Sequence, residues 1–316
     1  MIVVTGGAGF IGSNIVHGLN KRGIKDILIV DNLGTGPKFL NLNGLQYADY
    51  MHKDDFLELL RGPRQGYSAI IHQGACSDTT QTDNDYLMRN NYLYSKEVLN
   101  ACNRWHVPLI YASSAAVYGN GTAGFREELM CEQPLNGYAF SKLAFDNHVR
   151  HRRANGSLHT PVTGLRYFNV YGPQENHKGH MASVAFHLFN QLRDGGAMRL
   201  FEGSAGFRRD FIHVDDVVTV VLHFLDCPTT GIFNCGTGKA EPFTEVADSL
   251  QRLSPGGKVT EVPFPDHLKG KYQEYTCADL TQLREAGCGH GFMSLADGME
   301  RYHAVLAATD GYMTRS

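Results

Sequence analysis

The sequence predicts an α/β protein with a doubly wound parallel sheet and a smaller C-terminal α/β domain. Short β-branched runs alternate with longer segments whose apolar residues recur every three or four positions, which is typical of strand–helix–strand units. After about residue 170 this rhythm loosens into Gly- and Pro-containing pieces. We therefore expect a Rossmann-like domain at residues 1–170 and a second, substrate-binding domain at residues 171–316. A stretch near 210–237 is expected to return to the main sheet.

The apolar runs predict the individual elements in chain order. Buried strands of the parallel sheet are predicted at residues 2–5, 27–30, 69–72, 109–112 and 162–167. Such strands are continuous apolar runs because helices cover both of their faces. Amphipathic helices are predicted at residues 11–22 and 85–105 from their helical periodicity. Two later runs, 211–218 and 231–235, look strand-like and are expected to rejoin the main sheet.

Composition excludes several classes of protein. With 42% hydrophobic residues, the 316-residue chain can bury a substantial core, and its 29 basic and 32 acidic residues leave a formal charge of −3. This balance gives no electrostatic argument for nucleic acid or a membrane surface as partner. No apolar run approaches the roughly 18 residues of a spanning helix, and no signal-peptide core precedes the first glycines. Seven scattered Cys without a CxxC pair suit reduced thiols without a metal, so we expect a cytoplasmic protein.

A glycine-rich turn follows the first predicted strand and opens the first predicted helix. Residues 5–12 read TGGAGFIG, which places Gly6, Gly9 and Gly12 at the spacing of a dinucleotide-binding loop. Glycines allow the tight turn and the close approach of a pyrophosphate, while the helix N-terminus offers free N–H groups to the anion. Asp31 ends the second strand at about the distance expected for a ribose-binding carboxylate. The first domain is therefore predicted to bind a dinucleotide.

The residues after the second strand bear on the choice between NAD and NADP. Asp31 by itself favours NAD, because a carboxylate repels a 2′-phosphate. Asn32 and Lys38 follow closely, and Lys38 can pair with that phosphate. A solvated loop charge at Lys38 is an equally good interpretation from the sequence alone. We predict NADP, with NAD as the alternative.

Three residues predict the chemistry. Tyr138 and Lys142 form a YxxxK motif, whose spacing places both side chains on one helix face. An adjacent ammonium favours the phenolate, so we expect Lys142 to lower the pKa of Tyr138 from its usual value near 10, and also to hold the nicotinamide ribose. Ser114, just past the strand at 109–112, can bond the same substrate oxygen. With the glycine loop, this set resembles the extended short-chain dehydrogenase/reductase superfamily, whose members mostly modify nucleotide sugars.

The resemblance also separates reaction types. Dehydratases of that superfamily typically carry Thr-Asp-Glu where this chain has Ser114-Ala115-Ala116. Elimination of water needs an acid and a base that two Ala side chains do not supply. Dehydration is therefore not expected, and a redox or epimerase activity is.

The C-terminal half narrows the resemblance further. The segments QGACS at 73–77, RYFNVYGPQENHKGHMASV at 166–184, FEGS at 201–204 and RRDF at 208–211 resemble the ADP-L-glycero-D-manno-heptose 6-epimerase family of nucleotide-sugar epimerases. The HKG element with Lys178 is the most specific part. The resemblance implies interconversion of ADP-D-glycero- and ADP-L-glycero-D-manno-heptose through a 6-keto intermediate with tightly bound NADP. It also implies a homo-oligomer that supplies heptose for the lipopolysaccharide inner core.

The family resemblance assigns residues. Cofactor contacts are implied for Gly6, Gly9, Phe10, Ile11, Gly12, Asp31, Asn32, Lys38, Lys53, Gln73, Gly74, Ala75, Cys76, Ser77, Asn90, Lys142, Val170 and Lys178. Substrate contacts are implied for Ser114, Asn169, His180, His187, Phe201, Glu202, Gly203, Ser204, Arg209 and Tyr272. Tyr138 is expected to act as acid/base for one epimer and Lys178 for the other, with Ser114 and Lys142 assisting. Gln73 and His180 depart from the family pattern, which commonly has Glu and Ser there.

Other interpretations remain open at this stage. His187 on a helical stretch is more often a packing residue, and Phe201 is more often part of a core. The activity could belong to another nucleotide-sugar epimerase or reductase of the same superfamily. A silent dinucleotide-binding regulator is a third interpretation, but it has no need of the intact trio Ser114, Tyr138 and Lys142.

Overall fold

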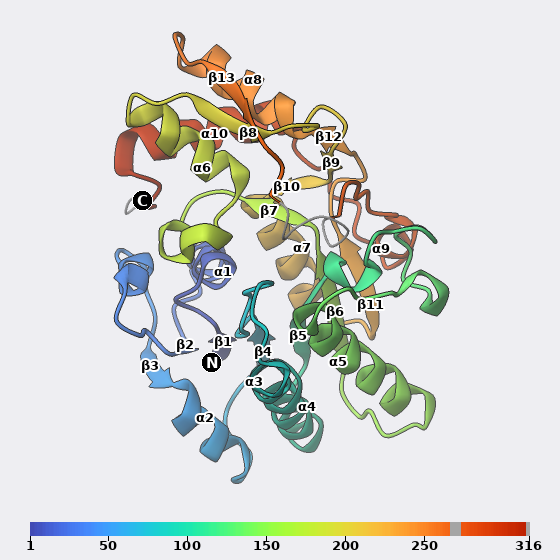
Figure 1. Ribbon diagram of the computed structural model, residues 1–316. Coiled ribbons are helices and arrows are strands. Elements are labelled where there is room, and N and C mark those ends of the chain that lie inside the picture. The colour runs from blue at the N-terminus through green and yellow to red at the C-terminus, as the bar shows by residue number, and fades with distance from the viewer. Residues whose placement is uncertain (266–272, 314–316) are drawn as a thin grey trace.

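The central element of the protein is a seven-stranded parallel sheet (Figure 1). The computed structural model describes residues 1–265 and 273–313. The strand order is β11-β6-β5-β4-β1-β2-β3. The bounds are β1 Ile2–Thr5, β2 Ile27–Asp31, β3 Asp49–His52, β4 Ala69–His72, β5 Leu109–Ser114, β6 Val162–Tyr167 and β11 Gly231–Cys235. The five strands predicted between residues 2 and 167 are confirmed. The order in which strands are added to the sheet reverses between β1 and β4, and folds of this kind bind their ligands at that point.

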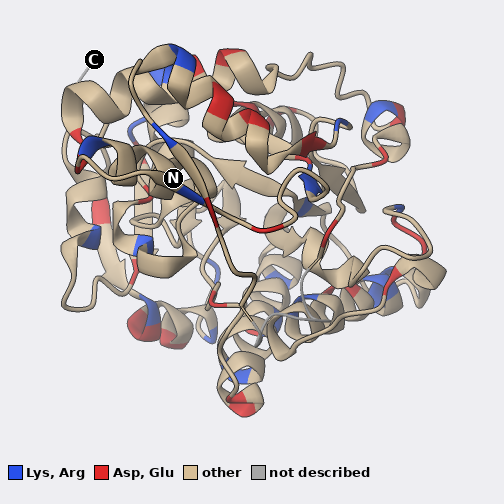
Figure 2. Cartoon of the chain, turned by 45° about the horizontal axis from the view of Figure 1, so that its top comes forward, with Lys and Arg blue, Asp and Glu red and all other residues tan. Residues whose placement is uncertain are grey.

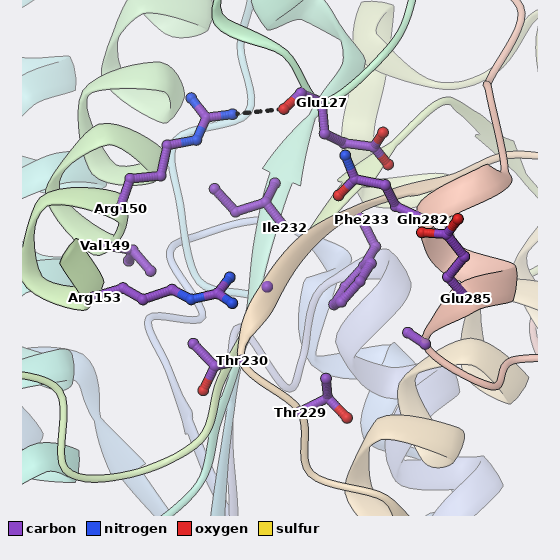
Figure 3. Close-up of a pocket in the computed structure, with 12 residues that line it drawn as sticks. Glu127, Val149, Arg150, Arg153, Thr229, Thr230, Ile232, Phe233, Gln282 and Glu285 are labelled. Carbon is purple, nitrogen blue, oxygen red and sulfur yellow. Dashed lines mark hydrogen bonds between the residues drawn. The ribbon is translucent and has the colours of Figure 1, made fainter.

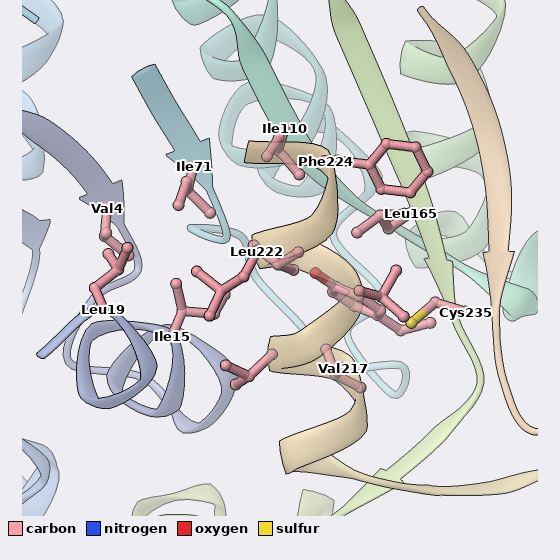
Figure 4. Close-up of a cluster of buried hydrophobic side chains, with 14 of the residues drawn as sticks. Val4, Ile15, Leu19, Ile71, Ile110, Leu165, Val217, Leu222, Phe224 and Cys235 are labelled. Atoms are coloured by element: carbon pink, nitrogen blue, oxygen red, sulfur yellow. The ribbon is translucent and has the colours of Figure 1, made fainter. Parts of the chain in front are cut away.

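Helices cover both faces of this sheet, because alternate strand residues point to opposite sides. On one face Val4, Ile71 and Leu165 pack against helices α1 (Phe10–Lys21) and α7 (Val214–Asp226), as Figure 4 shows. On the other face neighbouring strand residues such as Val3 and Ile70 contact α2 (Lys53–Leu60), α4 (Tyr94–Trp105) and α5 (Gly137–Ala154). The sheet is therefore buried from both sides, as its continuous apolar runs predict.

The predicted helix at 85–105 is present in three parts. Helix α3 spans Asn84–Leu87, a π-helical stretch η2 spans Met88–Leu93, and α4 follows. A π-helical turn inside a longer helix changes where its side chains point. Here it carries Asn90 and Asn91, which reach two different segments of the site described below.

The expected strand at 211–218 is wrong in most of its length. Only Phe211–His213 is a strand, β10, and it pairs with β7 (Asn169–Tyr171) outside the main sheet. Residues from Val214 onward form α7, which His213 caps by accepting the N–H of Asp215. Val217, Val220 and Val221 lie on the helix face that packs against the sheet. This packing outweighs the preference of Val for strands. The run at 231–235 does join the main sheet, whereas the domain boundary near 170 stays a prediction.

Two further elements carry no clear sequence signal. Strand β3 is half-exposed and contains polar residues at both ends. Helix α2 begins directly after it, at Lys53. A short polar edge strand lacks the apolar run that marks a buried strand, so β3 has no strand signal in the sequence. Helix α2 is only eight residues long and buries Phe56 and Leu60 alone, which is too short for a clear helical period.

The C-terminal half forms a second layer of structure above the sheet's carboxyl edge (Figure 1). It consists of α6 (Val184–Arg193), α8 (Phe243–Leu253) and α10 (Leu295–Thr309) with three two-stranded sheets, whereas α9 (Thr281–Glu285) packs beside β11 and adds Leu283 to the core of the main sheet. These sheets pair β10 with β7, β8 (Met198–Phe201) with β13 (Val259–Val262), and β9 (Arg208–Arg209) with β12 (Glu241–Pro242). Leu188, Leu250, Met299 and Tyr302 belong to its own core.

Basic and acidic segments are interspersed along the ribbon in the view of Figure 2. Among the described residues, no helix is both long and apolar enough to span a membrane.

Candidate active site

The glycine loop lies between β1 and α1 and is packed too tightly for larger residues. Gly6 has φ +67°, and a Cβ placed on it would come within 2.7 Å of the Gly74 nitrogen. A Cβ on Gly12 would come within 2.1 Å of the Gly6 carbonyl oxygen. No side chain caps the first turn of α1, so its first N–H groups remain available for an anion. The geometry fits the predicted dinucleotide loop.

Asp31 at the end of β2 is buried and already has a cationic partner. Its carboxylate accepts the Ala8 N–H at 2.9 Å and lies 2.5 Å from the Lys38 ammonium. Lys38 also donates to the Asn32 carbonyl at 3.0 Å. Because Lys38 neutralises Asp31, the carboxylate repels a nearby phosphate less than an isolated one would. The structure thus brings together the three residues predicted to select the cofactor.

The loop after β4 approaches the glycine loop and is held by a buried amide. The Asn91 side chain accepts the Cys76 N–H at 2.8 Å and donates to the Cys76 carbonyl at 3.0 Å. It also donates to the Ser141 hydroxyl on α5 at 3.0 Å. Asn91 thereby ties the 73–77 loop to the helix that carries Tyr138. At the start of this loop, Gln73 accepts a hydrogen bond from the Tyr167 hydroxyl at 3.0 Å.

Lys53 and Asn90, both predicted cofactor contacts, lie together although they are distant in sequence. The Lys53 ammonium donates to the Asn90 side-chain oxygen at 3.0 Å. At the end of β4, directly before the 73–77 loop, His72 forms two buried hydrogen bonds. Its ring contacts the Thr5 hydroxyl at 2.6 Å and the Ser95 hydroxyl at 2.9 Å. Burial, with a smaller effect of Lys142, lowers the pKa of His72 to about 3, so this imidazole is neutral.

The hydroxyl groups of Ser114 and Tyr138 meet at the carboxyl end of β5. Ser114 is the last residue of that strand, and its hydroxyl bonds with Tyr138, which lowers the pKa of the phenol. Burial is the larger effect, and together with the nearby Cys76 thiol it raises the pKa of Tyr138 overall. Two neighbouring hydroxyl groups can hold one substrate oxygen and exchange a proton with it.

The Lys142 ammonium lies one helical turn from Tyr138 and is buried. It donates to the Ala112 carbonyl at 2.9 Å, and burial lowers its pKa to about 8 against the smaller opposing effects of Asp146 and Cys76. The expected net lowering of the pKa of Tyr138 by Lys142 is therefore wrong. The reason is that the loss of hydration around the phenol has the larger effect.

Helix α5 is fixed against β5 by the carboxylate of Asp146. It accepts hydrogen bonds from Tyr111 and Ser113 on β5, both at 2.9 Å. Arg166 on β6 adds an ion pair at 2.8 Å, and these charges are fully buried. A buried charge of this kind requires full pairing, so the arrangement sets the position of Tyr138 relative to Ser114.

Lys178 lies in a 3₁₀-helical segment, η5 (Asn176–Met181). Its ammonium stands 5.0 Å from the centre of the Phe10 ring, at the first residue of α1. Burial lowers its pKa, which nearby Glu175 partly opposes. The structure therefore places Lys178 at the dinucleotide loop, as expected for a cofactor contact.

His180 follows in the same segment and is exposed. Its Nε2 atom lies 3.7 Å from an oxygen of Asp78 and 3.5 Å from the Thr80 hydroxyl. It therefore bridges η5 to the loop that contains Ser77. Its substrate contact stays a prediction.

Arg209 is buried beside the C-terminal layer, with its guanidinium 5.6 Å from the Phe243 ring centre. The next residue, Asp210, accepts N–H groups from Thr237, Gly238 and Ala278. The Asp210 carbonyl also accepts the Asn169 N–H at 3.0 Å. Asn169 thus bonds the backbone of the residue that follows Arg209, which brings two predicted substrate contacts into one region.

The remaining predicted substrate contacts make local interactions. In the turn after β8, the Glu202 N–H bonds the Val262 carbonyl at 2.9 Å and the Ser204 hydroxyl bonds the Phe201 carbonyl. His187 contacts the Phe186 ring edge-on within α6. Tyr272 lies outside the described residues. None of these observations tests a substrate contact, so all of them stay predictions.

A cavity of about 470 Å³ lies elsewhere, at the outer edge of β11 (Figure 3). Arg150 and Arg153 of α5 form one wall, and Gln282 and Glu285 of α9 form the other. Glu127 closes it by accepting the Asn234 N–H at 2.6 Å, and burial raises the pKa of Glu127 to about 7. The cavity contains none of the predicted site residues.

Sequence reasoning missed the polar residues that fix the site from behind, namely Asn41, His72, Asn91, Asp146 and Asp210. Their partners lie far away in sequence, so no local spacing marks them. A polar residue on the apolar face of a predicted helix is the one available signal, and it applies to Asn91 and Asp146.

Comparisons with known proteins agree with this geometry. The profile of the NAD dependent epimerase/dehydratase family matches residues 2–236. A protein of Brachyspira hyodysenteriae (strain ATCC 49526 / WA1), named ADP-L-glycero-D-manno-heptose-6-epimerase, is 54% identical over 99% of this chain and 100% of its own length.

Solved structures show the same fold. The Helicobacter pylori ADP-L-glycero-D-manno-heptose-6-epimerase superposes with a TM-score of 0.85 at 28% identity, covering 97% of this chain and 96% of that chain. The UDP-glucose 4-epimerase of Thermus thermophilus, solved with NAD, gives a TM-score of 0.80 at 27% identity over 98% and 99% of the two chains. From the glycine loop, the Ser114–Tyr138–Lys142 group and these matches, we conclude that the chain belongs to the NAD dependent epimerase/dehydratase family.

Proposed function

We propose that this protein is an isomerase that interconverts ADP-D-glycero-D-manno-heptose and ADP-L-glycero-D-manno-heptose at C6, with NADP held throughout. The observation that carries the proposal is the placement of two proton-transfer candidates at one dinucleotide site. Tyr138 bonds Ser114 beside the cofactor loops, and Lys178 stands over Phe10 at the start of α1. The 54% identity to a heptose epimerase over nearly the whole chain supports the choice of sugar.

The residues present fit a nicotinamide dinucleotide. The glycine loop leaves the first turn of α1 uncapped for the pyrophosphate. We assign Lys142 to the nicotinamide ribose, and Asp31, Asn32 and Lys38 to the adenine ribose. When bound, the nicotinamide accepts the hydride from C6 and returns it, and its positive oxidised ring favours the phenolate of Tyr138.

Epimerisation at C6 requires proton transfer at two positions. Oxidation removes the proton of the C6 hydroxyl, and we assign this step for one epimer to Tyr138 with Ser114 holding the same oxygen. Bound NADP would take up and return the hydride at one position, so the 6-ketone would have to turn within the pocket before its other face is reduced. Its oxygen then lies in a different place, where Lys178 supplies the proton. The same roles run in reverse for the other epimer.

The preference for NADP rests on the Lys38 ammonium. It already neutralises Asp31, and a 2′-phosphate would provide a second, fully charged partner. Asn32 lies next to Asp31 and can donate its side-chain amide to the same phosphate.

The test is a panel of ADP- and UDP-sugars offered to the purified protein, with product stereochemistry read by NMR. We expect inversion at C6 of the ADP-heptoses and no net consumption of NADP, since the hydride is returned in each turnover. Turnover confined to a UDP-sugar, or stoichiometric oxidation, would assign another epimerase or a reductase instead. A location in the cytoplasm, a homo-oligomeric state and a role in the lipopolysaccharide inner core belong to the same proposal.

A further inference from the structure

A fully buried amide, Asn41, connects the dinucleotide loop to the segment that carries Lys178. Asn41 lies in η1 (Pro37–Leu42), the 3₁₀ turn that also contains Lys38. Its side-chain nitrogen lies 3.0 Å from the Ala8 carbonyl oxygen in the glycine loop. The same nitrogen lies 3.1 Å from the Gln174 carbonyl oxygen and 3.1 Å from the His177 ring. One amide therefore contacts both the glycine loop and the segment that leads to Lys178.

Gln174 returns the contact and fixes the loop from its own end. Its side chain donates to the Asn41 carbonyl at 3.1 Å, so the two residues exchange side-chain and backbone bonds. Its N–H donates to the Gly311 carbonyl at 2.8 Å, which ties the loop to the C-terminal segment. Gln174 has φ +79°, a left-handed conformation that a non-glycine residue adopts at a cost. The surrounding bonds must therefore hold it there.

The hydrogen bonds that Asn41 makes and the one that it lacks indicate that its role is to fix the position of its neighbours rather than to stabilise the fold in general. Its side-chain oxygen has no partner among the described residues. A buried unpaired carbonyl oxygen is unfavourable, and an apolar side chain of similar shape would avoid it. What an apolar residue cannot supply is the pair of N–H donors that joins the Ala8 carbonyl to the Gln174 carbonyl.

The segment that receives these bonds ends at Lys178. The Lys178 N–H bonds the Glu175 carbonyl at 3.0 Å. Glu175 is itself buried and accepts hydrogen bonds from Ser183 and Tyr302. The segment is thus held at its far end by Glu175. Its position relative to the glycine loop is set by Asn41 together with Asn14 of α1, which donates to the Pro173 carbonyl at 2.9 Å.

We propose that Asn41 is a positioning residue that holds Lys178 in register with the dinucleotide loop through its bonds to the Ala8 and Gln174 carbonyls and its contact with the His177 ring. The catalytic part of this inference rests on the proposed function, because it matters for turnover only if Lys178 transfers a proton. The structural part, which concerns where the Lys178 ammonium stands, does not depend on the substrate.

The first test measures the Lys178 ammonium directly, without turnover. Asn41→Ala and the wild type are treated with an amine-acylating reagent over a range of pH, and acylation of Lys178 is followed by mass spectrometry. Loss of the buried bonds should raise the acylation rate of Lys178 by about tenfold at pH 7.5. Asn103→Ala is the matched control, because Asn103 is a buried amide that joins Ser157 and His159. It should leave the rate of Lys178 unchanged.

A second variant guards against simple misfolding. Gln174→Gly keeps the left-handed backbone without strain but removes the side-chain bonds to Asn41. If the two residues form one clamp, the double variant should alter acylation little more than either single variant, because contacting partners are not additive. Unchanged acylation of Lys178 in folded Asn41→Ala would overturn the positioning role.

The third measurement separates this inference from the proposed function. With ADP-heptose, Asn41→Ala should lower kcat about tenfold or more while KM changes little, and NADP should still bind as judged by calorimetry. A fall in NADP affinity without a fall in kcat would show that Asn41 serves the cofactor loop only and would overturn the inference. If the wild type does not epimerise ADP-heptose, the proposed function fails while the acylation result still decides the position of Lys178.

Discussion

Lys38 is the residue on which cofactor choice depends. In Lys38→Ala the 2′-phosphate loses a cationic partner, and Asp31 loses the ammonium that now lies 2.5 Å away. Both effects disfavour a phosphate, so we expect NADP affinity to fall by about tenfold or more while NAD affinity changes little. Calorimetric titration measures both, with the exposed Lys25→Ala as control. Equal changes for the two cofactors would contradict the assignment.

Tyr138 and Lys178 are predicted to act on different epimers. Tyr138→Phe and Lys178→Met should each lower epimerisation by about 10²–10⁴-fold, the scale of a general acid–base group, while still binding NADP. A 6-aldehyde analogue of the sugar allows hydride transfer to be followed without complete epimerisation. Lys96→Met is a suitable control, because Lys96 also lies over an aromatic ring, that of Tyr92, but outside the site. Normal epimerisation by Lys178→Met would end the two-base mechanism.

Arg209 is predicted to bind the substrate diphosphate. Its buried guanidinium can donate two parallel hydrogen bonds, which an Ala side chain cannot replace. We expect Arg209→Ala to raise KM for the ADP-sugar at least about tenfold. Steady-state kinetics at saturating NADP measure this, and Arg193→Ala, in an exposed ion pair, is the control. An unchanged KM would remove Arg209 from the substrate site.

At the scale of the element, the turn from β1 into α1 depends on the absence of a side chain at Gly12. A Cβ there would lie 2.1 Å from the Gly6 carbonyl oxygen, which is far inside van der Waals contact. Gly12→Ala should therefore distort the loop and abolish measurable NADP binding in a protein that still folds. Gly36→Ala is the control, since nothing lies within 4 Å of its Cβ position. Retained NADP affinity in Gly12→Ala would show that the turn can shift.

Elements also show where sequence patterns suffice. Buried strands such as β1 and β4 were predicted correctly, because helices on both faces require an uninterrupted apolar run. The Val-rich start of α7 has the same composition, yet it forms a helix because its apolar side chains meet α1 and the sheet at helical spacing. Local composition does not distinguish a buried strand from the start of α7. The elements against which the segment packs decide whether it forms a strand or a helix.

For the whole molecule, two buried neutral histidines predict the pH dependence of stability. The pKa of His72 is lowered to about 3 and that of His177 to about 4, each mainly by burial. An unfolded His titrates near 6.5, so below that pH the unfolded chain takes up protons that the folded chain does not. The free energy of unfolding should therefore fall as pH drops from about 6.5 towards 4, by up to about 1.4 kcal/mol per pH unit for each histidine. Urea unfolding at several pH values measures the slope.

The control for this prediction is His72→Gln, which removes one of the two titrating groups. Its stability should depend less steeply on pH than that of the wild type, whatever its stability at pH 7. An identical slope would show that His72 does not contribute.

At this scale the limits of the sequence as a guide to the site become clear. Ser114, Tyr138 and Lys142 were predictable because their spacing and order along the chain carry the chemistry. Asn41 was not, since its three partners come from Ala8, Gln174 and His177, and only folding brings these together. The net pKa of Tyr138 was also predicted wrongly, because burial depends on the whole cleft rather than on the neighbouring Lys142.

The contact of Glu127 with β11 has a consequence for solubility. A strand at the border of a sheet presents unpaired N–H and C=O groups, and these can recruit a strand from another molecule. The outward N–H of Asn234 is unavailable for this, because the Glu127 carboxylate already accepts it at 2.6 Å. At the opposite border, β3 is only four residues long and exposes Asp49 and His52. Both edges of the sheet are thus unfavourable for pairing with a strand of another molecule, which is the step that leads to aggregation.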